Sequence, residues 1–346
     1  MLRRNPGALL IVWFAAAGSL FCQNVTGEDA LAMFQQRRWA EAAAAFERLE
    51  KEQPGKTDAL LYRGKCLINL NRFSDAAADL EGYQATHPQS EDAAYLLAYV
   101  RFREDRPQES LQLYTQAAKL RSPAADDLKI VSLDYVLLND YDDAAHYLEL
   151  ALKMDPANTE ALYHLGRVRY QQNRFADAIA AFQEVLKREP GNVKAADNLG
   201  LSLEATNQID RATAAYQKAI SLDKAAAIHS EQPYLNLGML LAKSNKADES
   251  LPLLQEAEQI DPKSAKVRYE LGKTYFNLGQ IEKARGEAEE AARLNPQEGP
   301  THYLLGRIYH RLGKPDLEAR EFALTEELIR AKSHGEGGMA SGSDRR

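Results

Sequence analysis

A 34-residue period runs through most of this 346-residue chain and limits the folds that it can adopt. In one copy, Gly166, Ala178 and Pro190 stand twelve residues apart. The same spacing returns, with Gly, Ala or Ser in the first two places, at Gly64/Ala76/Pro88, Gly272/Ala284/Pro296, Ala30/Ala42/Pro54, Ser132/Ala144/Pro156 and Gly238/Ser250/Pro262. A fixed period of this length is typical of repeat architectures, in which each unit is stabilised by its neighbours.

Three further copies keep part of the pattern, and one insertion interrupts the period. The partial copies are Gly200/Ala212 followed by Lys224, Ala98/Ser110 with Pro123 one residue late, and Gly306 with Glu318 in the second small-residue place. Four extra residues lie within 225–233. Dividing residues 23–332 by the period gives about nine units.

Each copy predicts two helices joined by a short turn. In the copy that contains Gly166, apolar residues recur at spacings of three and four in both halves, as at Leu165 and Val168 and again at Phe182 and Val185. The segment "QQNR" (171–174) breaks this pattern, and a proline ends the copy because it cannot continue a helix. The chain is therefore expected to be all-α.

A glycine inside a helix is destabilising by roughly 0.5–1 kcal/mol relative to alanine, so its return in many copies needs a physical reason. Gly166 falls on the first helix and Ala178 on the second, which predicts a close approach of the two backbones, with Phe182 beside the contact. A leucine at Gly166 is expected to overpack this crossing.

These residues resemble the tetratricopeptide repeat (TPR) family, whose pattern matches Leu165-Gly166, Ala178, Phe182 and Pro190, with a large residue near Tyr170. The resemblance covers residues 23–332. It implies a right-handed α-solenoid of about nine 34-residue helix–turn–helix units. A closing helix is expected near 319–332, and the Gly/Ser-rich tail 333–346 is predicted to be disordered.

The first 22 residues have the composition of a secretory signal peptide. Arg3 and Arg4 precede the apolar run 8–21, and a polar segment follows. Cleavage after Cys22 is the favoured boundary, with Ala17 and Ser19 as alternatives. Phe21 argues against lipid attachment at Cys22, and an uncleaved N-terminal anchor stays open. Membrane contact is expected only through this N-terminal segment, if it is uncleaved or lipidated. We expect export to a bacterial periplasm or envelope, with secretion as the alternative.

No catalytic, metal or cofactor pattern was found in the sequence. The net charge of −7 disfavours nucleic acid as a partner. The seven histidines are scattered over separate repeats. "PGKT" (54–57) has Glu50 where a phosphate-binding loop needs glycine, and Cys66 stands among apolar residues. We therefore expect a protein that is not an enzyme and that uses no cofactor.

The resemblance also implies that the first helices line a concave groove through positions 2, 5, 9 and 12 of each repeat. Tyrosine, lysine and arginine are favoured there, and such residues are common at binding hot spots. The predicted groove residues are Lys65, Tyr95, Tyr99, Arg103, Tyr163, Arg167, Tyr170, Tyr269, Lys273, Phe276, Tyr303 and Arg307.

Two functions are compatible with this groove. The first is a non-enzymatic scaffold that binds a protein or peptide segment, with an acidic segment matching the basic side chains, in envelope assembly or secretion. The second is an accessory protein that handles polysaccharide or cell wall through its tyrosines. Salt discriminates the two, because binding by charged groups weakens at high ionic strength and tyrosine stacking barely responds.

Overall fold

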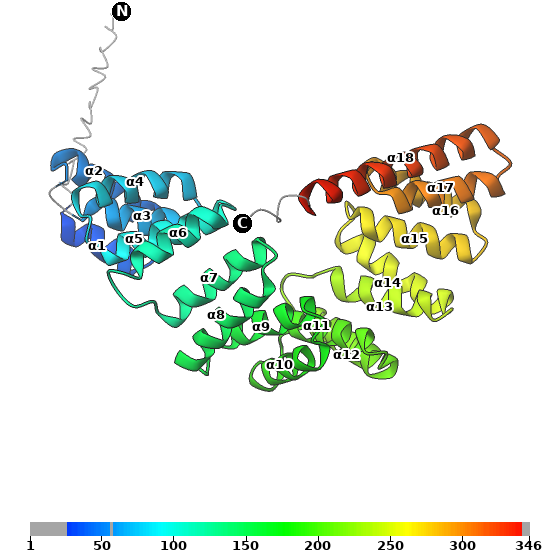
Figure 1. The fold of residues 1–346 in the computed structure, drawn as a ribbon, viewed down its shortest axis with the longest axis horizontal. Helices are drawn as coiled ribbons and strands as arrows, with labels where there is room; N and C mark the ends of the chain where they lie inside the picture. The colour runs from blue at the N-terminus through cyan, green and yellow to red at the C-terminus, as the bar shows by residue number, and fades with distance from the viewer. Residues whose placement is uncertain (1–25, 56–57, 341–346) are drawn as a thin grey trace, which may run out of the picture. The chain divides into compact units, whose positions relative to one another are not determined.

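The computed structural model describes residues 26–55 and 58–340, and their side chains as far as residue 333. This part of the chain forms eighteen helices in nine consecutive pairs (Figure 1), which confirms the expected all-α repeat fold. The first helices of the pairs are α1 (Gly27–Gln35), α3 (Ala59–Asn69), α5 (Glu91–Arg103), α7 (Ala125–Leu137), α9 (Thr159–Gln171), α11 (Val193–Ala205), α13 (Gln232–Lys243), α15 (Ala265–Asn277) and α17 (Gly299–Arg311). The second helices are α2 (Trp39–Glu52), α4 (Phe73–Thr86), α6 (Pro107–Ala117), α8 (Tyr141–Met154), α10 (Phe175–Arg188), α12 (Ile209–Asp223), α14 (Ala247–Ile260), α16 (Ile281–Leu294) and α18 (Pro315–Ala340).

The helices divide into two compact bodies, Met1–Ser122 and Pro123–Arg346. The N-terminal body contains α1–α6 and the C-terminal body contains α7–α18. The division falls at the repeat whose proline, Pro123, comes one residue late. In that repeat α6 has 11 residues, whereas α4 and α8 have 14 each. The insertion within 225–233 lies inside the C-terminal body.

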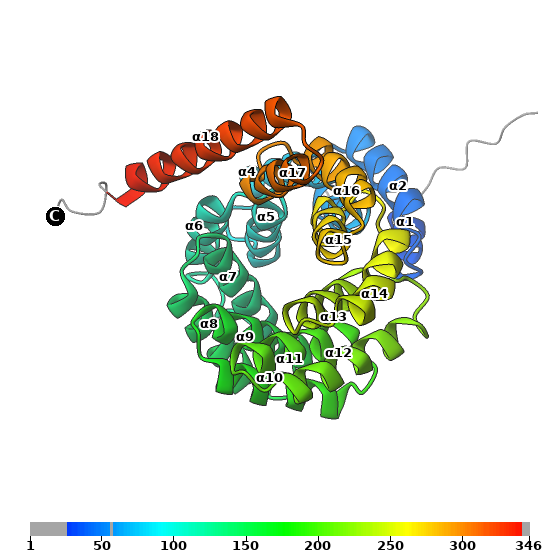
Figure 2. The same ribbon diagram turned by 90° about the vertical axis from the view of Figure 1, so that its right-hand side faces the viewer.

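Within the C-terminal body the helices form two layers. Each helix packs against the one before it and the one after it, and the first helices of consecutive repeats also contact each other, as in α9–α11, α11–α13, α13–α15 and α15–α17. Figure 2 shows α11, α13 and α15 on the inner side of the ribbon and α10, α12 and α14 on the outer side. The first helices therefore provide the inner face of this body.

The first small residue of a repeat makes room for the side chain sixteen residues later. A Cβ atom at Gly200 would lie 2.5 Å from the ring of Tyr216, and one at Gly166 would lie 2.8 Å from the ring of Phe182. Gly272 is different, because a Cβ there would meet the backbone oxygen of Ala284 at 3.3 Å. The expected close approach of backbones thus applies at Gly272, whereas Gly166 and Gly200 mainly accommodate an aromatic ring.

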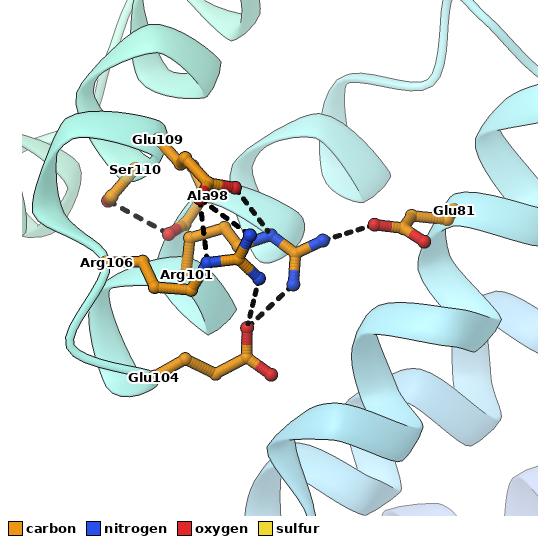
Figure 3. Close-up of polar contacts among 7 residues, drawn as sticks. All are labelled: Glu81, Ala98, Arg101, Glu104, Arg106, Glu109 and Ser110. Carbon is orange, nitrogen blue, oxygen red and sulfur yellow. Dashed lines mark hydrogen bonds and ion pairs between the residues drawn. The ribbon is translucent and has the colours of Figure 1, made fainter.

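Where serine takes the second small-residue place, its hydroxyl bonds to the partner helix. The Ser110 hydroxyl donates to the backbone oxygen of Ala98 over 3.0 Å (Figure 3), and Ser250 donates to that of Gly238 over 2.7 Å. Both serines are fully buried. Serine therefore fits this tight position because its polar atom has a partner.

Polar contacts between residues twenty apart join consecutive repeats. In the N-terminal body, Arg101 on α5 pairs with Glu81 on α4, and Arg101 also pairs with Glu104 at 2.7 Å (Figure 3). The C-terminal body contains three contacts of the same kind, Arg169–Glu149, Gln255–Tyr275 and Tyr309–Glu289. Each contact links the second helix of one repeat to the first helix of the next, which fixes the register between them.

The turn inside every repeat contains one residue in the left-handed region. Asparagine occupies it in five repeats, at Asn71, Asn139, Asn173, Asn207 and Asn245, and the others have Gly279, Gly313, Asp105 and Arg37. Glycine, asparagine and aspartate tolerate this conformation better than other residues do. The "QQNR" turn is thus explained by Asn173, whose φ is 58°.

Arg37 is the residue least suited to this turn position, with a φ of 58°. A left-handed conformation destabilises an ordinary residue by roughly 1–2 kcal/mol. Replacing Arg37 by glycine is expected to raise the free energy of unfolding by about 1 kcal/mol, since part of the gain is lost to the greater entropy of glycine in the unfolded chain. Urea denaturation measures the effect. The change Asn173→Ala should act in the opposite direction, and equal stability of all three proteins would contradict this explanation.

The C-terminal helix α18 spans Pro315–Ala340 and so runs over the predicted closing helix 319–332 and into residues 333–340. The predicted disorder of the tail 333–346 stays a prediction. The predicted signal segment 1–22 lies outside the described residues. None of the helices in the described part of the chain is long and apolar enough to span a membrane.

Candidate functional site

Three adjacent cavities on the first helices of the C-terminal body share one residue, Arg167. Their volumes are about 50, 430 and 580 Å³. The smallest is lined by residues of α7 and α9 and by Tyr141 of α8. The second is lined by residues of α9 and by Glu189, Asn192 and Lys194. The largest is lined by α9, α11, α13, the loop before α13 and Asp223 at the end of α12. We call these three cavities together the Arg167 groove.

Helix geometry explains why these side chains meet. The side chain of Asn158 caps α9 by accepting a hydrogen bond from the backbone N–H of Ala161 over 2.9 Å. Tyr163 and Arg167 are four residues apart and so share one face of α9. On α11, Asn192 caps in the same way, and Lys194, Asp197 and Leu201 follow at spacings of three and four along one face.

Two basic side chains border the groove without an acidic partner. Arg167 and Lys194 are both exposed, and neither forms an ion pair with any residue in the described part of the chain. Burial, followed by the charge of Arg167, lowers the pKa of the neighbouring His164 to about 4, so that histidine is neutral near pH 7. The positive charge here therefore comes from Arg167 and Lys194 and is available to a ligand.

Tyr163 is held between two helices. Its hydroxyl oxygen accepts a hydrogen bond from Nδ2 of Asn198 on α11 over 3.2 Å, and its ring lies 5.8 Å from that of Phe182. Burial raises the pKa of Tyr163. The ring is half-buried, so it forms a fixed part of the groove wall rather than a free stacking surface.

The four-residue insertion supplies another wall of the groove. The loop between α12 and α13 spans 224–231, whereas the corresponding loop between α10 and α11 spans 189–192. The carboxylate of Asp223, 1% exposed, accepts a hydrogen bond from the backbone N–H of Ser230 over 2.8 Å. Nδ1 of His229 lies 2.9 Å from the backbone oxygen of Asp223. These contacts hold Ile228, which is 87% exposed, at the edge of the largest cavity.

Family models of the tetratricopeptide repeat match most of the chain. One matches residues 29–91, 67–125, 132–193, 165–227 and 198–265, and a second matches residues 241–298. The chain belongs to the tetratricopeptide repeat family. TPR repeats generally bind protein or peptide segments and are typically non-catalytic, so this TPR chain is a protein–protein interaction scaffold.

Solved structures support the same fold. The yeast Tom70 structure superposes with a TM-score of 0.57 at 19% identity, covering 85% of this chain and 59% of that one. The APC/C hetero-tetramer Cut9–Hcn1 gives 0.59 at 15% identity, covering 84% and 57%. A TPR protein from Parabacteroides merdae gives 0.59 at 17% identity, covering 72% and 98%. This chain thus spans about three fifths of the first two structures. The comparison with curated protein sequences gave no match.

In the N-terminal TPR body, the predicted groove residues are largely engaged within the protein. Lys65 pairs with Asp92 at 2.7 Å. Arg103 donates to the hydroxyl of Tyr99 over 2.7 Å. Tyr95 is only 5% exposed and its hydroxyl donates to the backbone oxygen of Arg121, so it is an interior residue rather than the exposed contact that its position predicted.

In the C-terminal TPR body, the predicted residues fall into two groups. Tyr163 and Arg167 line the Arg167 groove, with Tyr170 half-buried on the same helix. A second group lies on α15 and α17. There Lys273 pairs with Glu270 at 3.1 Å, and Arg307 lies over the ring of Phe276 at 4.7 Å. Tyr269 lies beneath Lys273, and Tyr303 is 51% exposed. Partner binding by any of these residues stays a prediction.

Sequence reasoning missed three contributors to the groove. Lys194 and Asp197 occupy positions 2 and 5 of their TPR repeat, which are predicted groove positions. They were not among the predicted groove residues, because most of those were chosen in repeats with aromatic residues at these positions. The insertion was noticed, yet its sequence does not reveal that Ile228 lies beside a cavity. Position within the repeat, rather than residue type, was the sequence feature that could have identified Lys194 and Asp197 as groove residues.

Proposed function

We propose that this TPR protein binds an extended segment of a partner protein in the Arg167 groove. The observation that carries the proposal is that Arg167, exposed and without an ion-pair partner among the described residues, lines all three adjacent cavities. Binding sites are commonly concave, with a few convergent polar groups among apolar walls. Leu133 and Val136 supply apolar wall on one side of Arg167.

The chemistry of the groove favours a partner segment with an acidic residue. Arg167 and Lys194 together offer two cations to one carboxylate, and arginine pairs with carboxylates in a bidentate geometry. The neutral state of His164 adds no competing charge. A polysaccharide partner is less well supported in this groove, because Tyr163 and Tyr170 on α9 are half-buried and present little free ring face.

Capture from an extract of the source cells tests the groove. The immobilised protein is compared with the variant Arg167→Glu, and bound proteins are identified by mass spectrometry. We expect at least one protein to be retained by the parent and lost by the folded variant. Identical sets of bound proteins would show that the groove is not the binding site.

We further propose that the protein acts after export, in a bacterial envelope. The support is the basic and apolar composition of residues 1–22. The N-terminal sequence of the protein purified from its source cells tests this proposal, and a start at Gln23 is expected. An intact start at Met1 together with a cytosolic fraction would overturn the proposal, while the proposed groove function would be unaffected.

A further inference from the structure

We infer that the largest cavity of the Arg167 groove accepts a basic side chain, lysine or arginine, from the bound segment, and that Asp197 is its partner. This inference rests on the proposed function and adds a second specificity element to it. The bound segment would then carry an acidic residue for Arg167 and Lys194 and a basic residue for Asp197.

Asp197 has a buried carboxylate whose negative charge is stabilised by few groups of the protein itself. It is 5% exposed and lines the cavity of about 580 Å³. Both of its oxygens accept from the same amide nitrogen, Nδ2 of Asn236, over 2.9 and 3.0 Å. Among the described residues, no cation pairs with Asp197. An ionised carboxyl group offers about four acceptor positions, so most of its capacity remains available to a donor entering the cavity.

A second buried aspartate shows how the fold treats such a charge elsewhere. Asp79 on α4 is also 5% exposed, but the guanidinium of Arg63 lies 2.7 Å from its carboxylate. Burying an unpaired charge is unfavourable, and breaking a buried pair is strongly destabilising. The described part of the chain thus provides a cation for Asp79 and none for Asp197, which borders a cavity.

The surroundings of Asp197 fit a long basic side chain. Oδ1 of Asn236 accepts from Nε2 of Gln232 over 2.9 Å, which orients the amide toward the carboxylate. Tyr163, Val193 and Leu201 offer apolar wall for the alkyl stem of lysine or arginine. The neighbouring carboxylate of Asp223 is already bonded to Ser230. Burial raises the pKa of Asp197 to about 6, which leaves the group mostly ionised at pH 7 and consistent with this role.

Titration with a small probe tests the inference directly. The ¹⁵N-labelled chain at pH 7 is titrated with N-acetyl-arginine amide, and N-acetyl-citrulline amide serves as the neutral probe of similar shape. We expect saturable shifts of the Ser230 backbone amide and the Asn236 side-chain amide with the arginine probe only. The variant Asp197→Asn should weaken this binding at least tenfold, and the matched variant Asp79→Asn should leave it unchanged.

The possible outcomes separate this inference from the proposed function. Equal response of the parent protein to both probes, or unchanged arginine binding in Asp197→Asn, would overturn the inference. If Asp197→Asn also retains the captured partner that Arg167→Glu loses, the groove function stands and the basic subsite is excluded. The comparison of the two probes on the parent protein keeps the test decisive even if a variant folds poorly.

Discussion

Reversing the charge of Arg167 is expected to weaken binding of the captured partner segment by about 100-fold or more. Removing one partner of a hydrogen-bonded charge pair that is buried in an interface typically changes the binding free energy by roughly 2–5 kcal/mol, and about 1.4 kcal/mol corresponds to a factor of ten. Arg167 lines every cavity of the groove, so glutamate there would also repel the acidic residue at close range. Isothermal titration calorimetry with the identified segment measures the loss.

The control for this prediction is the same substitution on the outer layer. Arg211 is an exposed arginine on α12 that hydrogen-bonds Gln208, and Arg211→Glu is expected to bind like the parent protein. Raising the salt concentration should weaken binding to the parent more than to Arg167→Glu, because exposed charge interactions are screened. Equal affinity of parent and Arg167→Glu, or equal loss in both variants, would argue against a specific contact at Arg167.

The change Gly200→Leu is expected to lower the free energy of unfolding by about 3 kcal/mol, at the upper end of the usual effect of overpacking. A Cβ at this position already falls 2.5 Å from the ring of Tyr216, too close for any real contact. Tyr216 has little freedom to move, because it is completely buried and its hydroxyl donates to Glu204 over 3.1 Å. Chemical denaturation followed by circular dichroism gives the value.

Gly286 provides the matched control for this experiment. It lies in α16, is exposed, and has no atom within 4 Å of the place where a Cβ would stand. Gly286→Leu is expected to leave stability unchanged or to raise it slightly, since leucine favours a helix more than glycine does. Similar losses in both variants would mean that helix position, rather than the contact with Tyr216, explains the effect.

The repeat pattern predicted the helix pairs and their turns, because each repeat is a local unit with the same internal contacts. The inner layer was implied by the resemblance to the TPR family. What the pattern could not predict depends on neighbours in space. Gly166 was correctly identified as a tight position, but its contact is the ring of Phe182 and not mainly a backbone. The division after Ser122 coincides with the short helix α6 and the late Pro123, and the period did not reveal it.

The candidate site depends even more on which residues are neighbours in space, and the repeat pattern does not predict these neighbours. Tyr95 and Tyr163 hold the same position in their repeats, yet Tyr95 is buried against Tyr114 and beneath Arg121, whereas Tyr163 reaches a cavity. Position in the repeat predicts which face a side chain occupies. The next segment of chain decides whether that face is covered, and this information is not contained in the repeat pattern.

The inserted loop is anchored at its ends, whereas several residues between its ends are exposed. Asp223 and the N-terminus of α13 hold the ends of the loop, while Ala225, Ala227 and Ile228 between them are exposed. Ile228 lines the largest cavity, so substitutions in this exposed segment are expected to alter that border while leaving the helix pairs in place. The loop is therefore the natural place to randomise residues when retargeting this scaffold, in the way that an antibody framework carries variable loops.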